Sequence, residues 1–125
     1  MNAEEWGMID YFDPYEFGIE AIPGVNDFME FQFVSMVDRI RNILGYPLRI
    51  CSGYRTVLHN EEVGGVSDSA HCKGLAADIS CSFGADRFRL IEAALAVGFK
   101  RIGIGKNFVH VDLDDSKPSP AIWLY

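Results

Sequence analysis

Apolar residues recur every three or four positions in the second quarter of the chain, which is the spacing of a helix with one buried face. Asn26 and Asp27 precede this segment as possible N-cap residues, and Gly45 and Pro47 end it. The pattern predicts a helix over 28–44. Its apolar stripe consists of Phe28, Phe31, Val34, Met36, Val37, Ile40, Ile43 and Leu44.

A second helical pattern covers 86–97 and ends at Gly98. Its predicted inner face comprises Phe88, Ile91, Ala94 and Leu95. Short apolar runs elsewhere predict strands over 47–52, 75–80, 101–104 and 108–113, with an edge strand at 122–125. Residues 56–69 read as a loop or short helix. Because helices and strands alternate irregularly around one hairpin, we expect an α+β domain: a mainly antiparallel central sheet with helices packed on it.

The first 24 residues are rich in aromatic and acidic side chains and show no clear period. Pro14, Pro23 and Gly24 interrupt them. We expect an extended lead-in, with a short helix, that packs on the core through its aromatic rings. An arm that binds a partner is the alternative.

Length and charge narrow the function classes. A chain of 125 residues fits one domain, over 1–125, and 18 Asp+Glu against 11 Lys+Arg give a net charge of -7. Such a balance disfavours binding to nucleic acid or to anionic membranes. No export signal or membrane-spanning run is apparent, so we expect a chain made in the cytoplasm. Three cysteines without a CxxC pair favour reduced thiols.

Candidate chemistry centres on His71, Asp78 and His110. In the strand over 108–113, His110 shares a face with Asp112, opposite the valines on either side of it. Asp78 likewise points away from its small apolar neighbours, and His71 lies on the loop before that strand. Two imidazoles and a carboxylate suit zinc with one open position, which can acidify a bound water. The plain alternative is two hydrogen-bonded histidines and an Asp that caps a turn.

A series of motifs in fixed order resembles a known family over 47–113, and weakly outside that range apart from Trp123. The motifs are Ser52-Gly53-Tyr54-Arg55, His59-Asn60, Val63-Gly64-Gly65, Ser69-x-His71-x-x-Gly74-x-Ala76-x-Asp78 and Phe108-Val109-His110-Val111-Asp112. The series resembles the zinc D-alanyl-D-alanine carboxypeptidases, which include phage L-alanyl-D-glutamate endopeptidases and are related in fold to the hedgehog signalling domain. This resemblance implies zinc held by His71, Asp78 and His110. It also implies that Arg55 holds a substrate carboxylate or carbonyl, as its planar, always-charged fork allows.

One position departs from the family pattern. Many members carry a Glu or Asp general base three residues before the last histidine ligand, where this chain has Asn107. Others carry a histidine two residues before that ligand, where this chain has Phe108. Asp112 is the nearest carboxylate, so we expect it either to accept the proton of the attacking water or to orient a ligand imidazole.

The resemblance implies a zinc-dependent peptidase that cleaves peptidoglycan stem peptides. It leaves open a D-Ala-D-Ala carboxypeptidase or an L-Ala-D-Glu endopeptidase, and it suits a phage or prophage lysis enzyme. For such an enzyme we expect a monomer that acts on the cell wall after release. A zinc-stabilised binding or structural module without catalysis is the alternative, which Asn107 favours and Arg55 disfavours. A dipeptidase or amidase acting on another substrate is a third reading.

Overall fold

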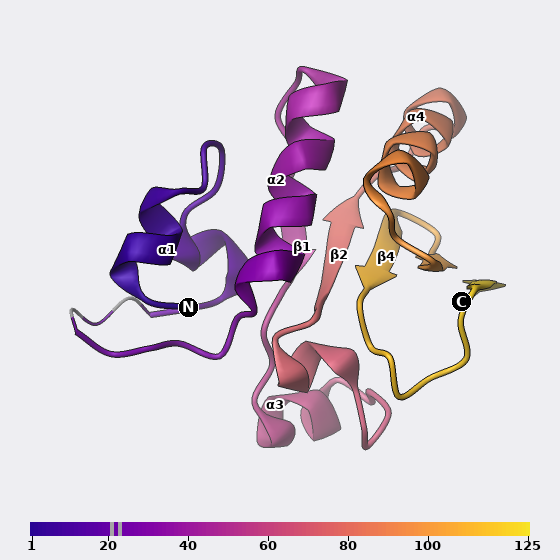
Figure 1. Cartoon of the computed structure of the whole chain (residues 1–125). Coiled ribbons are helices and arrows are strands. Elements are labelled where there is room, and N and C mark those ends of the chain that lie inside the picture. The colour runs from indigo at the N-terminus through magenta and orange to yellow at the C-terminus, as the bar shows by residue number, and fades with distance from the viewer. Residues whose placement is uncertain (21, 23) are drawn as a thin grey trace.

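A single five-stranded sheet forms the centre of the fold in the computed structural model, which describes residues 1–20, 22 and 24–125 (Figure 1). The strand order is β1-β2-β4-β3-β5. Pairings within the first four strands are antiparallel, and β5 pairs in parallel with β3. The strands are β1 Ile50–Ser52, β2 Ala76–Ser80, β3 Arg101–Ile104, β4 Phe108–Asp112 and β5 Ala121–Leu124. The predicted α+β class is confirmed.

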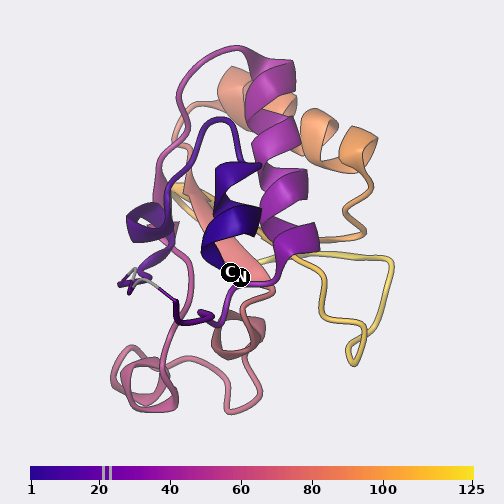
Figure 2. The ribbon, with the colours of Figure 1, turned by 60° about the vertical axis from the view of Figure 1, so that its left-hand side comes forward.

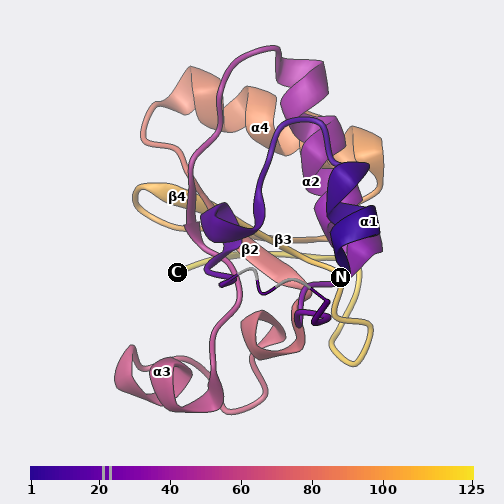
Figure 3. The same ribbon diagram turned by 90° about the vertical axis from the view of Figure 1, so that its left-hand side faces the viewer.

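Two long helices, α2 (Phe31–Leu44) and α4 (Gly84–Val97), cover one face of this sheet and enclose the core against it. Val109 and Val111 of β4 point into that core and are fully buried. The short helices are α1 Ala3–Gly7, η1 Pro14–Phe17, α3 Val57–Glu62 and η2 Ala70–Lys73. Figure 3 shows α3 and η2 on the side of the sheet opposite α4.

The first long helix begins later than its apolar pattern predicts. It starts at Phe31, and Asp27 is not its N-cap. Asp27 instead accepts hydrogen bonds from the Trp6 indole at 2.6 Å and from the Met29 amide at 2.9 Å. Residues 28–30 lie outside the helix, and the Glu30 amide donates to the Gly74 carbonyl at 3.1 Å, which ties this segment to the end of η2.

The predicted inner face of α4 is wrong in two positions. Phe88 and Leu95 are 68% and 57% exposed. The buried positions are Leu90, Ala93, Ala94 and Val97. Small alanines let α4 approach α2 closely, whereas the larger Phe88 and Leu95 lie on a face that no element of the described chain covers.

The N-terminal segment packs on the core, as expected, and lies beside α2 in Figure 2. Phe12 and Phe17 are buried and meet edge to face with ring centroids 5.6 Å apart. The predicted break at Pro23 lies outside the described residues. The cysteines at 51, 72 and 81 are free thiols. No helix in the described part of the chain has the length and apolar character needed to cross a membrane.

Asp114 fastens the segment after β4 to η2. Its carboxylate accepts hydrogen bonds from Lys73 Nζ at 2.8 Å and Ser116 Oγ at 2.6 Å, and its side chain is 1% exposed. Burial raises the pKa of Asp114, but these donors outweigh burial and lower the pKa to about 2. The charged carboxylate therefore stabilises the fold above the unfolded-state pKa of about 3.9, and this stabilisation is lost as the pH falls toward 2.

We expect Asp114→Asn to lower the free energy of unfolding by about 1–2 kcal/mol at neutral pH, because it removes the charge that both donors face. The difference from the parent should shrink as the pH falls below about 4. Urea unfolding at several pH values measures it, with the neighbouring exposed Asp115→Asn as the matched control. A difference that does not change with pH would contradict this assignment.

Candidate metal centre

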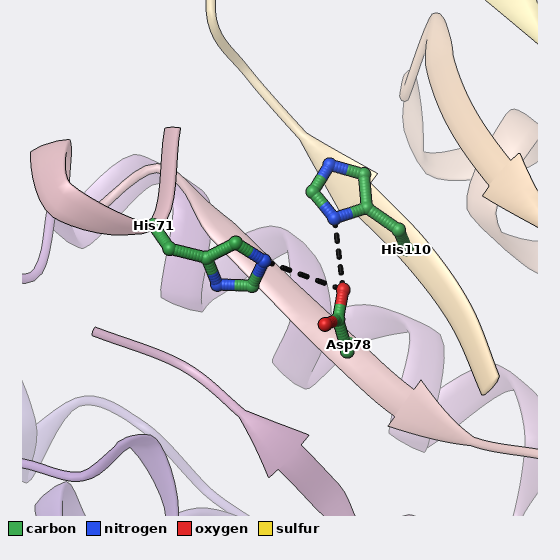
Figure 4. Close-up of side chains that lie close together, drawn as sticks. All are labelled: His71, Asp78 and His110. Carbon is green, nitrogen blue, oxygen red and sulfur yellow. Dashed lines mark hydrogen bonds and ion pairs between the residues drawn. The ribbon is translucent and has the colours of Figure 1, made fainter. Parts of the chain in front are cut away.

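His71, Asp78 and His110 meet on the polar face of the sheet (Figure 4). They come from η2, β2 and β4, and they are 4%, 8% and 5% exposed. Asp78 Oδ1 lies 3.3 Å from His71 Nε2 and 2.8 Å from His110 Nδ1. One ligand atom from each residue lies within 4.8 Å of the other two. The structure thus gathers the three residues that the resemblance implies as zinc ligands.

Local structure explains why these side chains converge. Asp78 and His110 are direct cross-strand partners in the antiparallel pair β2–β4, so their side chains leave the sheet side by side. His71 reaches them from η2, whose last residues turn into β2 through Gly74 at φ 71°. A Cβ at Gly74 would lie 1.7 Å from the Phe28 carbonyl oxygen, so only glycine fits this turn.

The backbone of the loop after β1 orients His71. The Gly53 carbonyl lies 2.7 Å from His71 Nδ1, which leaves Nε2 facing the cluster. That loop is itself pressed against η1: the Tyr54 amide donates to the Phe17 carbonyl at 2.9 Å, and a Cβ at Gly53 would lie 2.6 Å from the same oxygen. Phe17 thereby supports the orientation of a candidate metal ligand.

Asp112 contacts the opposite side of the His110 ring from Asp78. Its Oδ2 is 2.7 Å from His110 Nε2, on the side of the ring away from the cluster. Its Oδ1 accepts from Arg101 Nε at 2.7 Å and from the Asp114 amide at 3.0 Å. Both oxygens are engaged and the residue is 2% exposed. Of the two expected roles, this geometry favours orienting the imidazole, a pattern common around metal sites.

The electrostatics of the cluster favour a bound positive charge. Burial raises the pKa of Asp78, but hydrogen bonds from His110 and His71 outweigh it and hold that pKa well below its usual range. Burial lowers the pKa of His110, and its bonds to Asp112 and Asp78 reverse the shift and raise it. Without a metal, the site therefore keeps its carboxylates ionised and attracts a proton to His110.

The donor set fits zinc. Two imidazole nitrogens and one carboxylate oxygen are a common three-residue set for a catalytic zinc with one open position. Ligand atoms about 2.1 Å from a tetrahedral ion lie about 3.4 Å apart, close to the separation between Asp78 and His71. Each imidazole has its other nitrogen held by an acceptor, Gly53 for His71 and Asp112 for His110. Both rings are therefore fixed in the orientation that a metal needs.

Arg55 lies next to the cluster, with its side chain 17% exposed. Its Nε donates to Ser52 Oγ at 3.1 Å, and its terminal nitrogens lie 3.3 Å from Asn60 Oδ1 and 3.4 Å from Asp78 Oδ2. Asn60 also donates to the Val66 carbonyl at 2.6 Å and so ties its loop, as expected. These bonds hold the guanidinium beside Asp78.

The cluster opens onto a cleft of about 780 Å³. The sequence did not point to two of the residues that line this cleft, Arg101 and Tyr125, and it marked Trp123 as part of the resemblance without placing it at the site. The guanidinium of Arg101 lies 4.7 Å from the centre of the Trp123 ring. Asn107, at the turn between β3 and β4, is exposed and is not among the residues that line the cleft.

We expect Asp112→Asn to weaken zinc binding about 10- to 100-fold, because the amide cannot hold His110 as the carboxylate does. The rate at saturating zinc should fall less. Competition with a coloured chelator measures the affinity, and Asp115→Asn serves as the control. Unchanged affinity with a rate lowered about 10²- to 10⁴-fold would instead identify Asp112 as the proton acceptor.

Comparison with known proteins agrees with this geometry. A family model described as Peptidase M15 matches residues 13–112, which is most of the chain and includes the cluster and Arg55. A search of curated proteins gives no match. The matched segment ends with β4, so β5 and its aromatic residues lie outside it. The chain belongs to the Peptidase M15 family of zinc peptidases.

Proposed function

We propose that this protein cleaves the stem peptides of peptidoglycan, either as a D-Ala-D-Ala carboxypeptidase or as an L-Ala-D-Glu endopeptidase. The observation that carries the proposal is the position of Arg55, a partly exposed guanidinium beside a buried two-histidine, one-aspartate cluster at an open cleft. Release during lysis by a phage or prophage would bring a chain of this kind to its substrate.

In this proposal each residue of the cleft has a distinct role in binding the substrate or holding the metal site. Zinc bound at the cluster would acidify a water and polarise the scissile carbonyl. Arg55 binds a carboxylate or carbonyl oxygen of the substrate and so fixes the peptide next to the cluster. Asp112, with both oxygens engaged, holds His110 in place, and Arg101 holds Asp112 in turn.

A second candidate is a zinc-stabilised module that binds peptidoglycan without cleaving it. Asn107 favours this candidate, because it replaces the carboxylate that serves as base in many relatives. The engagement of Asp112 by Arg101 and His110 adds to that argument.

One experiment separates these candidates. Zinc-loaded protein is incubated with purified peptidoglycan, and the soluble products are identified by mass spectrometry. A carboxypeptidase shortens the stem peptide by one alanine, whereas an endopeptidase frees the stem peptide after its first alanine. Sedimentation of the protein with intact, unaltered peptidoglycan would support the binding module, and neither binding nor cleavage would contradict both.

Asn107→Asp tests directly whether a base has been lost. Because Asn107 is exposed and outside the cleft lining, we expect the substitution to change the rate of peptide hydrolysis by less than about threefold. Zinc content is measured in parallel to exclude a change at the cluster. A gain of about 10²-fold or more would show that the parent had lost its base and would favour the binding module.

A further inference from the structure

One straight row of partner residues crosses all five strands at the level of the metal cluster. Ser52 pairs with Asp78, Asp78 with His110, His110 with Gly103, and Gly103 with Trp123. Neighbouring strands are about 4.8 Å apart, so the row spans about 19 Å. The cluster lies in the middle of the row. A peptide bound along the row would extend from the cluster toward β1 in one direction and toward β5 in the other.

The β1 end of the row is cationic and the β5 end is aromatic. Arg55 lies beside Ser52, within 3.1 Å of its hydroxyl. At the other end, Trp123 and Tyr125 lean over β3 until their ring centroids are 5.6 and 6.2 Å from that of His110. Phe108 joins them, 5.1 Å from the Tyr125 ring. We call Phe108, Trp123 and Tyr125 the aromatic wall.

A glycine makes room for the aromatic wall. A Cβ at Gly103 would lie 2.5 Å from Tyr125 Cε2 and 2.8 Å from Trp123 Cε2, closer than real Cβ atoms come. Any other residue at this position on β3 would push both rings away from the cluster. Their position over the cleft therefore depends on Gly103.

The three side chains of the aromatic wall are uncharged. The guanidinium of Arg101 is covered by the Trp123 ring and bonded to Asp112. A tyrosine phenol has an ordinary pKa of about 10, so the Tyr125 side chain is neutral at physiological pH. A ligand group placed here meets apolar ring faces and gains no ion pair.

We propose that the aromatic wall is a subsite for an uncharged, apolar residue on the amino side of the scissile bond, and that Tyr125 is its main specificity-determining contact. The proposal rests on the proposed function, because Arg55 must hold the carboxyl side of the peptide for the amino side to reach β5. Tyr125 is 67% exposed and lines the cleft, so its ring face is accessible to such a residue.

Binding of uncleavable peptides tests the subsite. The probes are acetyl-X-D-alanine peptides with an N-methylated scissile amide, in which X is D-leucine, glycine or D-glutamate. Calorimetry with the zinc-loaded protein should show the D-leucine peptide binding about tenfold more tightly than the other two. Tyr125→Ala should lower this preference at least about threefold, and Tyr125→Phe should keep it. Leu124→Ala is the matched control, because Leu124 is 80% exposed and alternates with the aromatic residues along β5.

Gly103→Ala provides a second test that leaves every aromatic residue in place. It should abolish the preference by displacing both rings, while zinc content stays that of the parent. Equal binding of the three peptides by the parent, or an unchanged preference in both Tyr125→Ala and Gly103→Ala, would overturn the proposal. A preference retained by a parent that cleaves no unmethylated peptide would support the subsite and contradict the peptidase function.

Discussion

His71→Ala is expected to retain less than about a tenth of the zinc of the parent and no measurable peptidase activity. The substitution removes one of the three proposed ligands, and the remaining two are too few to hold zinc tightly. It also removes the imidazole that the Gly53 carbonyl holds, so the loop after β1 loses one of its ties to the cluster and keeps the contact of Arg55 with Asp78. Elemental analysis of protein purified without added zinc gives the metal content.

The control for this experiment is the third histidine. His59 lies on α3 with its side chain 57% exposed and pairs with Glu62 at 3.8 Å. His59→Ala should keep the zinc content and the activity of the parent. Circular dichroism establishes that both variants are folded. Full zinc content in folded His71→Ala would refute the assignment of His71 as a ligand.

Arg55→Ala is expected to lower kcat/KM by about 30- to 1000-fold, which corresponds to about 2–4 kcal/mol of transition-state stabilisation. The guanidinium of Arg55 lines the cleft and is not one of the three residues of the cluster. Zinc content should therefore be unchanged in Arg55→Ala. Arg55→Lys should recover only part of the loss, because an ammonium cannot make the two parallel bonds of a guanidinium. Steady-state kinetics on a stem-peptide substrate measures both variants.

Arg89→Ala is the matched control, since Arg89 lies on α4 with its side chain 60% exposed and is not among the residues that line the cleft. It should hydrolyse the peptide at the rate of the parent. If Arg55→Ala is equally active, Arg55 has no role in substrate binding, and the chief support for a peptidase rather than a binding module is lost.

Much of the polar face of the sheet could be predicted from strand alternation. The valines at 109 and 111 required one face of that strand to be buried, which placed His110 and Asp112 together on the other. Alternation could not say which imidazole nitrogen faces which carboxylate. It therefore left open whether Asp112 accepts a proton or orients the His110 imidazole. The His110 ring points Nδ1 at Asp78 and Nε2 at Asp112, which favours the orienting role.

The order of the strands was beyond any local pattern. β4 inserts between β2 and β3, and β5 returns in parallel beyond β3, so Trp123 reaches His110 across a strand that lies about twenty residues earlier in the chain.

The buried face of a helix was also hard to predict. In α4 both Phe88 and Leu90 fit an apolar stripe, and only the close approach to α2 selects the face with the alanines.

The contact between Phe17 and the loop after β1 links a hydrophobic core residue to the orientation of His71. Phe17 is completely buried, and its carbonyl receives the Tyr54 amide directly after the glycine that holds His71. Any residue at this position would offer the same carbonyl, so the Phe17 side chain matters because its buried ring fixes where that carbonyl lies. A smaller side chain here is expected to loosen the support of His71, and so to lower zinc affinity together with the stability of the fold, although position 17 would touch neither metal nor substrate.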